Sequence, residues 1–141
     1  MDFLTSFKVT SSALAAQRLR LNIIAENVAN AQTTRTPEGG PYKRRDPVFQ
    51  AQPFADVLDQ TKAAGSTGVS VDRIMVDQKP PRMQYDPNHP DANQDGYVAM
   101  PNIDVVTEMV NMMSASRSYE SNVSVLNASK AMALKALEIG R

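Results

Sequence analysis

Residues 3–31 read FLTSFKVTSSALAAQRLRLNIIAENVANA, and this stretch decides the fold because it combines a helical period with an absence of helix-breaking residues. Apolar side chains recur at alternating intervals of four and three residues, which is the spacing of a coiled-coil seam. No glycine or proline occurs between residues 2 and 36. The sequence therefore predicts a single helix, about 45 Å long if it spans about thirty residues. Its predicted seam consists of Phe3, Phe7, Thr10, Leu14, Gln17, Leu21, Ile24, Val28 and Ala31.

The last forty residues repeat this pattern. Pro101 ends the preceding segment, and either Asn102 or Asp104 can cap the first turn of a helix. Gly140 stands where a C-cap glycine is expected. The sequence therefore predicts a second helix over residues 104–139, about 54 Å long. Its predicted seam consists of Val105, Met109, Met112, Ser116, Tyr119, Val123, Leu126, Lys130, Ala133 and Leu137.

Residues 36–101 differ from both ends because they hold all nine prolines of the chain. Alternating apolar and polar residues predict strands at residues 42–50, 69–76, 82–85 and 97–99. The prolines restrict such strands to sheet edges or short lengths. We therefore expect an α+β fold, in which two long terminal helices pair as a coiled coil beside a small, irregular β-rich middle module.

The lengths of these parts imply partners outside the chain. Helices of about 45–55 Å cannot be covered by a module of about sixty residues, so their seams must meet each other, as an antiparallel or hairpin-like pair, and also meet other subunits. We expect a terminal helical domain, residues 1–35 and 102–141, and a middle module, residues 36–101. A long helix alone is marginally stable, so we expect the ends to order on assembly. The predicted assembly interface consists of Phe3, Phe7, Leu14, Gln17, Leu21, Ile24, Val28, Met109, Met112, Tyr119, Val123, Leu126 and Leu137.

Composition argues against several functional classes. Fifteen basic residues balance fifteen acidic ones, so no net charge attracts nucleic acid, and the basic run at residues 43–45 is interpreted as a solvated strand or loop face. The absence of cysteine excludes disulfides and thiolate chemistry. No run of about 18 apolar residues predicts a membrane-spanning helix, and the N-terminus lacks the features of a cleaved Sec signal. We therefore expect neither nucleic-acid binding nor direct membrane insertion.

The strongest candidate for a chemical site is the sequence DANQDG at residues 91–96, which matches the first half of an EF-hand calcium loop. The twelfth position of that loop is Asn102, where calcium binding requires a bidentate glutamate. An Asx-rich turn that leads into a short strand is the better interpretation. The one histidine, His89, lies in a proline-rich turn that gives little support to a catalytic triad, and no glycine-rich phosphate loop occurs. We expect no enzymatic activity, no cofactor and no metal.

Two groups of residues resemble a known family. Residues 12–22, SALAAQRLRLN, followed by residues 26–31, ENVANA, resemble the N-terminal signature of flagellar rod and hook axial proteins. Residues 95–106, DGYVAMPNIDVV, with residues 108–110, EMV, and residues 114–120, SASRSYE, are similar to proximal rod proteins of the FlgC type. The first group is shared across the axial family, whereas the second selects the FlgC type. The residues of the resemblance singled out as its motif are Asn27, Asn30, Gly96, Tyr97, Pro101, Asn102, Glu108, Asn122 and Asn127.

The resemblance implies a non-enzymatic subunit of the proximal rod in the bacterial flagellar basal body, which transmits torque, lines the export channel and is required for motility. It also implies that the terminal helices form the inner layer of the rod and that the middle module lies outside. The implied partners are copies of the chain, other rod proteins, the rod's export-gate adaptor, the membrane ring and the flagellar type III export machinery. Export by that machinery agrees with the missing Sec signal.

Three other interpretations remain open at this point. Another rod component, of the FlgB type, would share the N-terminal signature. A cytoplasmic coiled-coil adaptor would share the seams. A metal-dependent binding module could be built on Asp91, Asn93 and Asp95.

Overall fold

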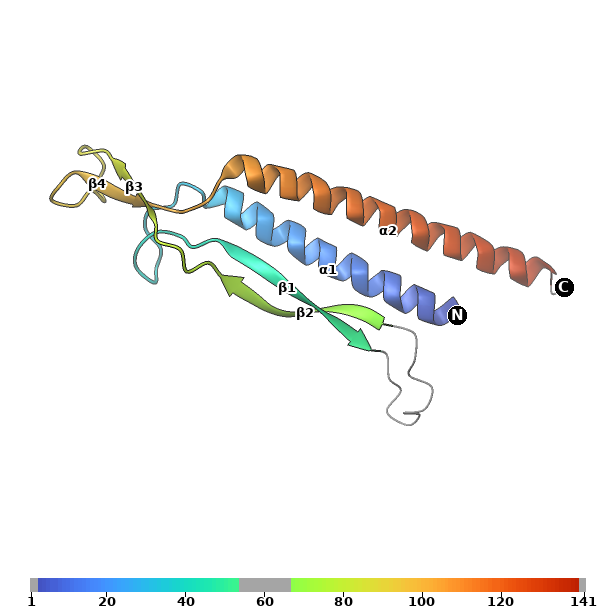
Figure 1. Ribbon diagram of the computed structural model, residues 1–141. Helices are drawn as coiled ribbons and strands as arrows, with labels where there is room; N and C mark the ends of the chain where they lie inside the picture. The colour runs from blue at the N-terminus through green and yellow to red at the C-terminus, as the bar shows by residue number, and fades with distance from the viewer. Residues whose placement is uncertain (1–2, 54–66, 140–141) are drawn as a thin grey trace.

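The computed structural model describes residues 3–53 and 67–139. Two long helices dominate it: α1, Phe3–Ala29, and α2, Val105–Ile139. They lie side by side and antiparallel, so the two ends of the chain come together at one end of the molecule (Figure 1). The α+β class and the two terminal helices are confirmed. Because α2 has 35 residues and α1 has 27, α2 continues about 12 Å beyond the start of α1 at about 1.5 Å per residue.

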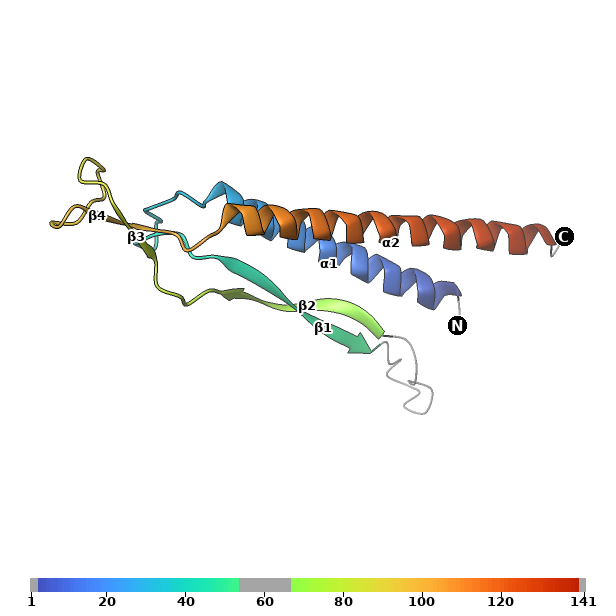
Figure 2. The same cartoon turned by 45° about the horizontal axis from the view of Figure 1, so that its top comes forward.

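The middle of the chain forms two small antiparallel sheets. Strands β1, Arg45–Pro53, and β2, Thr67–Val76, make a long hairpin, while β3, Arg82–Tyr85, and β4, Tyr97–Met100, pair with each other. The β3–β4 pair lies at the end of the molecule opposite the chain termini, and both views agree on this (Figures 1 and 2). The predicted strands are therefore confirmed, and the middle module consists of two separate two-stranded sheets.

A bulge in the β1–β2 hairpin changes the side-chain alternation that the sequence suggested. Val48 pairs with Arg73, but the next residue of β1, Phe49, pairs with Val71. Asp72 is therefore an extra residue on β2, and the two-residue period restarts on either side of it. Such a bulge increases the local twist of a hairpin.

Helix α1 lies between α2 and the β1–β2 hairpin. It contacts α2, β1 and β2, whereas α2 among the described elements contacts α1 alone (Figure 1). The small core follows from this arrangement, because α1 must bury side chains toward two partners while α2 buries one narrow face. The buried apolar residues are Ala16, Ile23, Ile24, Ala31, Val98, Ile103 and Ala115.

The three most buried residues of α2 each lie one position before a member of the predicted seam. Glu108, Ala115 and Ser129 are buried, whereas the seam residues Met109 and Leu137 are 52% and 70% exposed. Lys130 is also exposed, and the other seven members of the predicted seam are half-buried: Val105, Met112, Ser116, Tyr119, Val123, Leu126 and Ala133. The buried and half-buried residues that share the near-heptad stripe of Glu108 are Glu108, Met112, Ala115, Tyr119, Asn122, Leu126, Ser129 and Ala133.

The first turn of α2 is capped by Asp104, one of the two predicted caps. The Val106 N–H donates to Asp104 Oδ1 at 3.2 Å, and the Thr107 hydroxyl donates to the other carboxylate oxygen. The hydrogen bond from Thr107, together with those from the backbone, lowers the pKa of Asp104 below its ordinary value. The predicted C-cap, Gly140, lies outside the described residues. In the part of the chain that the structure describes, neither helix combines the length and apolarity needed to cross a membrane.

Candidate functional site

Three segments of the chain meet where α1 ends, β1 begins and α2 begins. The cluster at this point, which we call the joint, is made by Asn27, Tyr42, Arg44, Arg45 and Glu108. Asn27 lies in the last turn of α1 and Glu108 in the first turn of α2, and the two residues are 0% and 1% exposed. Burying polar groups this deeply is costly unless they are hydrogen-bonded, and the side chains of the joint supply those hydrogen bonds to one another.

The Asn27 side chain uses all four of its hydrogen-bonding positions. Its Nδ2 donates to the Arg45 carbonyl at 2.8 Å and to Glu108 Oε2 at 3.2 Å. Its Oδ1 accepts from the Arg45 N–H at 2.9 Å and from the Tyr42 hydroxyl at 3.2 Å. The amide thus takes up both backbone groups of Arg45, as a neighbouring strand would, and it reaches α2 with its remaining N–H. The amide side chains of asparagine and glutamine can both donate and accept in this way.

Glu108 connects α2 to the residue just before β1, Arg44. Arg44 Nε donates to Glu108 Oε1 at 2.9 Å, and the guanidinium also pairs with Asp46 at 3.2 Å. Burial alone would lower the pKa of Arg44, but the hydrogen bonds to Glu108 and Asp46 outweigh burial and raise that pKa. Arg44 therefore stays charged and compensates the buried carboxylate. A carboxylate in the first helical turn is favoured by the helix dipole as well.

Tyr42 closes the joint on the side of the connecting turn. Its backbone N–H donates to the Thr33 carbonyl at 3.0 Å, which brings the chain back toward α1 after residues 34–41. Burial is the main reason that the pKa of the Tyr42 hydroxyl is raised, while the nearby Arg45 acts in the opposite direction. The guanidinium carbon of Arg45 lies 5.7 Å from the Tyr42 ring centroid, within range of a cation–π contact. The hydroxyl therefore remains a neutral donor to Asn27.

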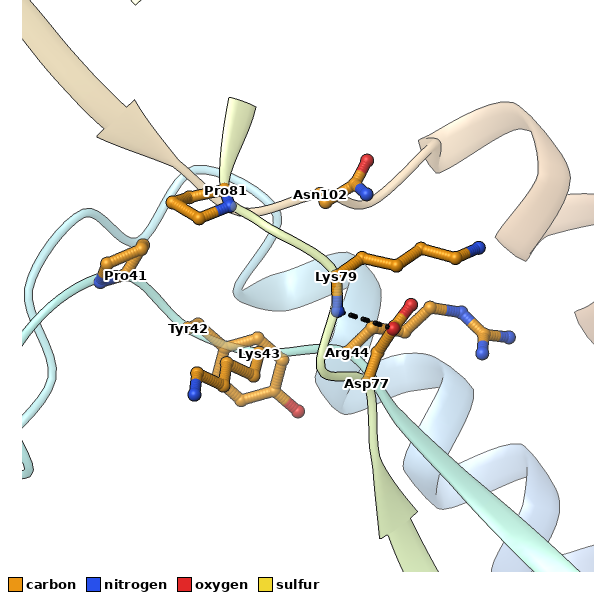
Figure 3. A pocket seen from close by; sticks show the side chains of 8 residues that line it. All are labelled: Pro41, Tyr42, Lys43, Arg44, Asp77, Lys79, Pro81 and Asn102. Atoms are coloured by element: carbon orange, nitrogen blue, oxygen red, sulfur yellow. Dashed lines mark hydrogen bonds between the residues drawn. The ribbon is translucent and has the colours of Figure 1, made fainter. Parts of the chain in front are cut away.

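A shallow pocket lies beside the joint, where the segment that follows β2 passes close to it. Tyr42 and Arg44 form one wall, and Lys79 and Asn102 form the other (Figure 3). The Lys79 backbone N–H donates to the Asp77 carboxylate at 3.0 Å, so this segment is held by its own turn (Figure 3). No nucleophile with an adjacent base lines this pocket, and among the described residues no group of three acidic or histidine side chains could hold a metal ion.

The turn between β3 and β4 contains the residues considered for calcium. Asn93 Oδ1 accepts from the backbone N–H groups of Asp95 and Tyr97, at 3.0 and 2.8 Å. Asp91 Oδ2 accepts from the Thr34 hydroxyl at 2.8 Å. These bonds are those of an Asx-type turn, which is the interpretation the sequence favoured. Gly96 has φ +78°, a conformation that suits glycine, and the Tyr85 and Tyr97 rings pack edge to face with centroids 5.3 Å apart across the sheet.

Comparison with known proteins gives these features a family. The family described as "Flagella basal body rod protein" matches residues 7–35, and that described as "Flagellar basal body rod FlgEFG protein C-terminal" matches residues 94–139. "Flagellar basal-body rod protein FlgC" of Salmonella typhimurium is 45% identical over 141 residues, covering 100% of both chains. The chain belongs to the FlgC family of flagellar basal-body rod proteins. The FlgC proteins of Borreliella burgdorferi and Bacillus subtilis are each 43% identical, covering 99% and 96% of this chain and 98% and 97% of their own.

The family motif residues quoted from the sequence have distinct structural roles. Asn27 and Glu108 are brought together in the joint, although 81 residues separate them. Asn30 Nδ2 donates to the Glu26 carbonyl at 2.9 Å, and Asn30 Oδ1 accepts from Thr33, so it shapes the turn after α1. Gly96 ends the β3–β4 turn, and Tyr97 begins β4 opposite Tyr85. Of the remaining motif residues, one is buried, one half-buried and two exposed: Pro101, Asn122, Asn102 and Asn127, respectively.

The predicted interface residues of this FlgC-family chain range from buried to exposed. Ile24 is buried, and Met109 and Leu137 are exposed. Gln17 Oε1 is buried and has no hydrogen-bond partner among the described residues. The side chain of Phe3 lies outside the described residues, although its backbone begins α1. The remaining members are all half-buried: Phe7, Leu14, Leu21, Val28, Met112, Tyr119, Val123 and Leu126.

Sequence reasoning missed Tyr42 and Arg44. The run Lys43-Arg44-Arg45 was interpreted as a solvated face, yet the Arg44 side chain is 25% exposed and pairs with a carboxylate that is 2% exposed. The sequence of α2 contains a usable signal, because Glu108 lies on the same helix face as the small buried residues Ala115 and Ser129. An acidic residue at such a position requires a basic partner from elsewhere in the chain.

Proposed function

We propose that the chain is a structural subunit of the proximal rod in the flagellar basal body, where it transmits torque and lines the export channel. The observation that carries this proposal is the match to the FlgC protein of Salmonella typhimurium, which is 45% identical and extends over the full length of both chains. The basal-body location predicted from the sequence is confirmed by the same family membership. The role requires packing and stiffness, and we propose no catalytic step.

The arrangement of the helices supports this role. A shaft needs subunits that resist bending and shear, and α1 is held between α2 on one side and the β1–β2 hairpin on the other (Figure 1). We propose that residues 1–35 and 102–141 form a coiled-coil domain in the inner layer and that residues 36–101 lie outside it. The near-heptad spacing of the buried face of α2 agrees with a coiled-coil pair.

The outer face of α2 supports assembly with neighbours. Its first three turns expose a patch of four apolar side chains, which are between 52% and 69% exposed: Val106, Met109, Val110 and Met113. Exposed apolar patches on soluble chains mark interaction sites, and methionine adapts to irregular partners. We propose that this patch and the exposed end of α2 around Leu137 pack against other subunits. The proposed partners are copies of the chain, other rod proteins, the rod's export-gate adaptor, the membrane ring and the type III export machinery.

The test of the function is complementation in a motile bacterium. A strain that lacks its own copy of this gene should have no complete rods by electron microscopy of isolated basal bodies, and the restored chain should return both rods and swimming. Normal rods in the deletion strain would refute the proposal.

A second test addresses the patch on α2. Val110→Asp should prevent incorporation into rods because it places a charge in an apolar interface, while leaving the circular dichroism of the purified chain unchanged. Ser114→Asp, on an exposed polar position one turn further along α2, is the matched control and should assemble. Equal incorporation of both variants would show that the patch is not an interface.

A further inference from the structure

We propose that the joint fixes the orientation of the β1–β2 hairpin on the helix pair, and that neighbouring subunits accept the chain in this one orientation. Arg44 and Glu108 then act as positioning residues, in addition to any part in stability. This inference rests on the proposed function as a rod subunit, because orientation matters only where several neighbours must fit at once.

Two adjacent residues at the base of the hairpin connect it to both helices: Arg44, just before β1, and Arg45, its first residue. The backbone of Arg45 is held by Asn27 of α1 through two hydrogen bonds, at 2.8 and 2.9 Å. The side chain of Arg44 is held by Glu108 of α2 at 2.9 Å. Because the two attachments come from neighbouring residues and go to different helices, they restrict rotation of the hairpin about either helix axis.

Beyond the joint, α2 meets α1 through small buried residues and larger half-buried ones. Ala115 and Ser129 are buried, and Met112, Tyr119 and Leu126 are half-buried. Other side-chain hydrogen bonds of α2 stay within the helix, as from Ser118 to the Ser114 carbonyl and from Ser124 to the Glu120 carbonyl. A slip by one residue would leave the Asn27 amide and the Glu108 carboxylate buried without partners. The joint therefore selects the register of the helices and fixes the hairpin at its base, while the Val69 N–H, which donates to Ser12 Oγ at 3.1 Å, holds β2 further along α1.

Stability and positioning can be separated at this site. A buried ion pair can often be replaced by uncharged side chains with little loss of stability, because its attraction is offset by the cost of desolvation. Replacing both partners, Arg44→Met together with Glu108→Gln, removes the attachment of the strand to α2. The glutamine oxygen can still accept from Asn27, and the glutamine Nε2 then faces the Asn111 side chain, whose amide can turn to offer its oxygen as an acceptor.

Two measurements on this double variant test the inference. The chain has no cysteine, so cysteines introduced at the exposed positions Gln50 and Arg117 serve only as sites for spin labels. We expect a narrow distance distribution between the labels in the wild-type background and a broad one in the double variant. We also expect a melting temperature within about 4 °C of the wild type, with loss of rod incorporation. Arg44→Lys, which keeps the charge opposite Glu108, should retain the narrow distribution and assemble.

Asp46→Asn supplies the control, because it removes the exposed ion pair of Arg44 and leaves the bond to Glu108. A double variant with an unchanged distance distribution, or one that enters rods normally, would overturn the inference. So would a double variant that does not fold, since the joint would then serve stability alone. Failure of the wild-type chain to restore rods in the deletion strain would refute the proposed function, while the label distances would still decide the inference.

Discussion

Asn27→Asp offers the sharpest test of the joint because it changes one atom of a side chain that is 0% exposed. The aspartate can still accept hydrogen bonds from the Arg45 N–H and the Tyr42 hydroxyl. It can no longer donate to the Arg45 carbonyl or to Glu108 Oε2, which lie 2.8 and 3.2 Å from the present Nδ2. It also places a second carboxylate beside that of Glu108.

The expected loss can be estimated from these contacts. Each buried acceptor that loses its donor costs about 1–3 kcal/mol. A buried charge without a compensating partner costs about 3–5 kcal/mol. Because these costs overlap at one site, we expect the free energy of unfolding to fall by about 3–5 kcal/mol, a large part of the typical total of about 5–15 kcal/mol.

The assay is urea unfolding of the purified chain, followed by circular dichroism. With a typical slope of about 2 kcal/mol per molar urea, the midpoint should fall by about 2 M. Asn22→Asp, at an exposed position of α1, is the matched control and should change the stability by less than about 0.5 kcal/mol. Equal midpoints for the two variants would refute the account of the joint.

The pH dependence of this variant provides a further check. Burial beside Glu108 disfavours the charged form, so the pKa of the new carboxyl should be raised in the folded state above its ordinary value of about 3.9. A raised pKa favours folding below the unfolded pKa, and that benefit disappears as the pH rises through the folded pKa. The loss in free energy of unfolding relative to the wild type should therefore be smallest near pH 4 and should grow toward pH 7. A loss that grows as the pH falls would contradict the assigned geometry.

Three further predictions follow from individual residues. Gly96→Ala should lower the melting temperature more than Gly39→Ala. Both glycines have positive φ, so an alanine at either position carries a backbone cost of about 1–2 kcal/mol. A Cβ at Gly96 would in addition lie 2.9 Å from the Tyr85 ring, whereas nothing lies within 4 Å of one at Gly39. Equal shifts would exclude the contact. Asp104→Ala should lower the melting temperature at neutral pH. Because the pKa of Asp104 is lowered from 3.8, its contribution to stability is present above that value and is lost as the pH falls through the lowered pKa. The melting temperatures of wild type and variant should therefore converge in acid. A difference that persists at low pH would argue against the cap. Val123→Pro should abolish incorporation into rods because proline inside α2 costs about 3 kcal/mol and kinks the helix, while Val123→Ala should assemble. Rods built from the proline variant would show that a straight α2 is dispensable.

Much of the fold could be predicted from local pattern. The seams and the absence of helix breakers predicted both helices, which the structure places at Phe3–Ala29 and Val105–Ile139. The strand predicted at residues 82–85 coincides with β3, because proline and turn residues bound it on both sides. Asp104 was a predicted cap for the same local reason, since an N-cap bonds to residues that follow it directly.

The inward face of α2 was not predictable in the same way. Two overlapping stripes on this helix have nearly heptad spacing, and hydrophobicity favoured the one that contains Met109 and Leu137. The chain instead buries the stripe with Glu108 and Ala115, because the partner surface offers Asn27 and Arg44 at one point and close helix packing beyond it. Spacing along one segment cannot distinguish these stripes, since the distinction depends on what the other segment presents.

By itself, then, the sequence determined the helices, the strands and the family, because helix period, turn residues and motif identity are properties of short stretches. The tertiary structure alone decided which polar residues act together. Asn27 and Glu108 were each recognised as motif residues, but their contact spans 81 residues and depends on the antiparallel pairing of α1 and α2. The basic run around Arg44 predicted a solvated side chain, whereas in the fold a buried carboxylate lies beside it. A side chain's partner is set by the path of the whole chain, and burial then makes that partner obligatory.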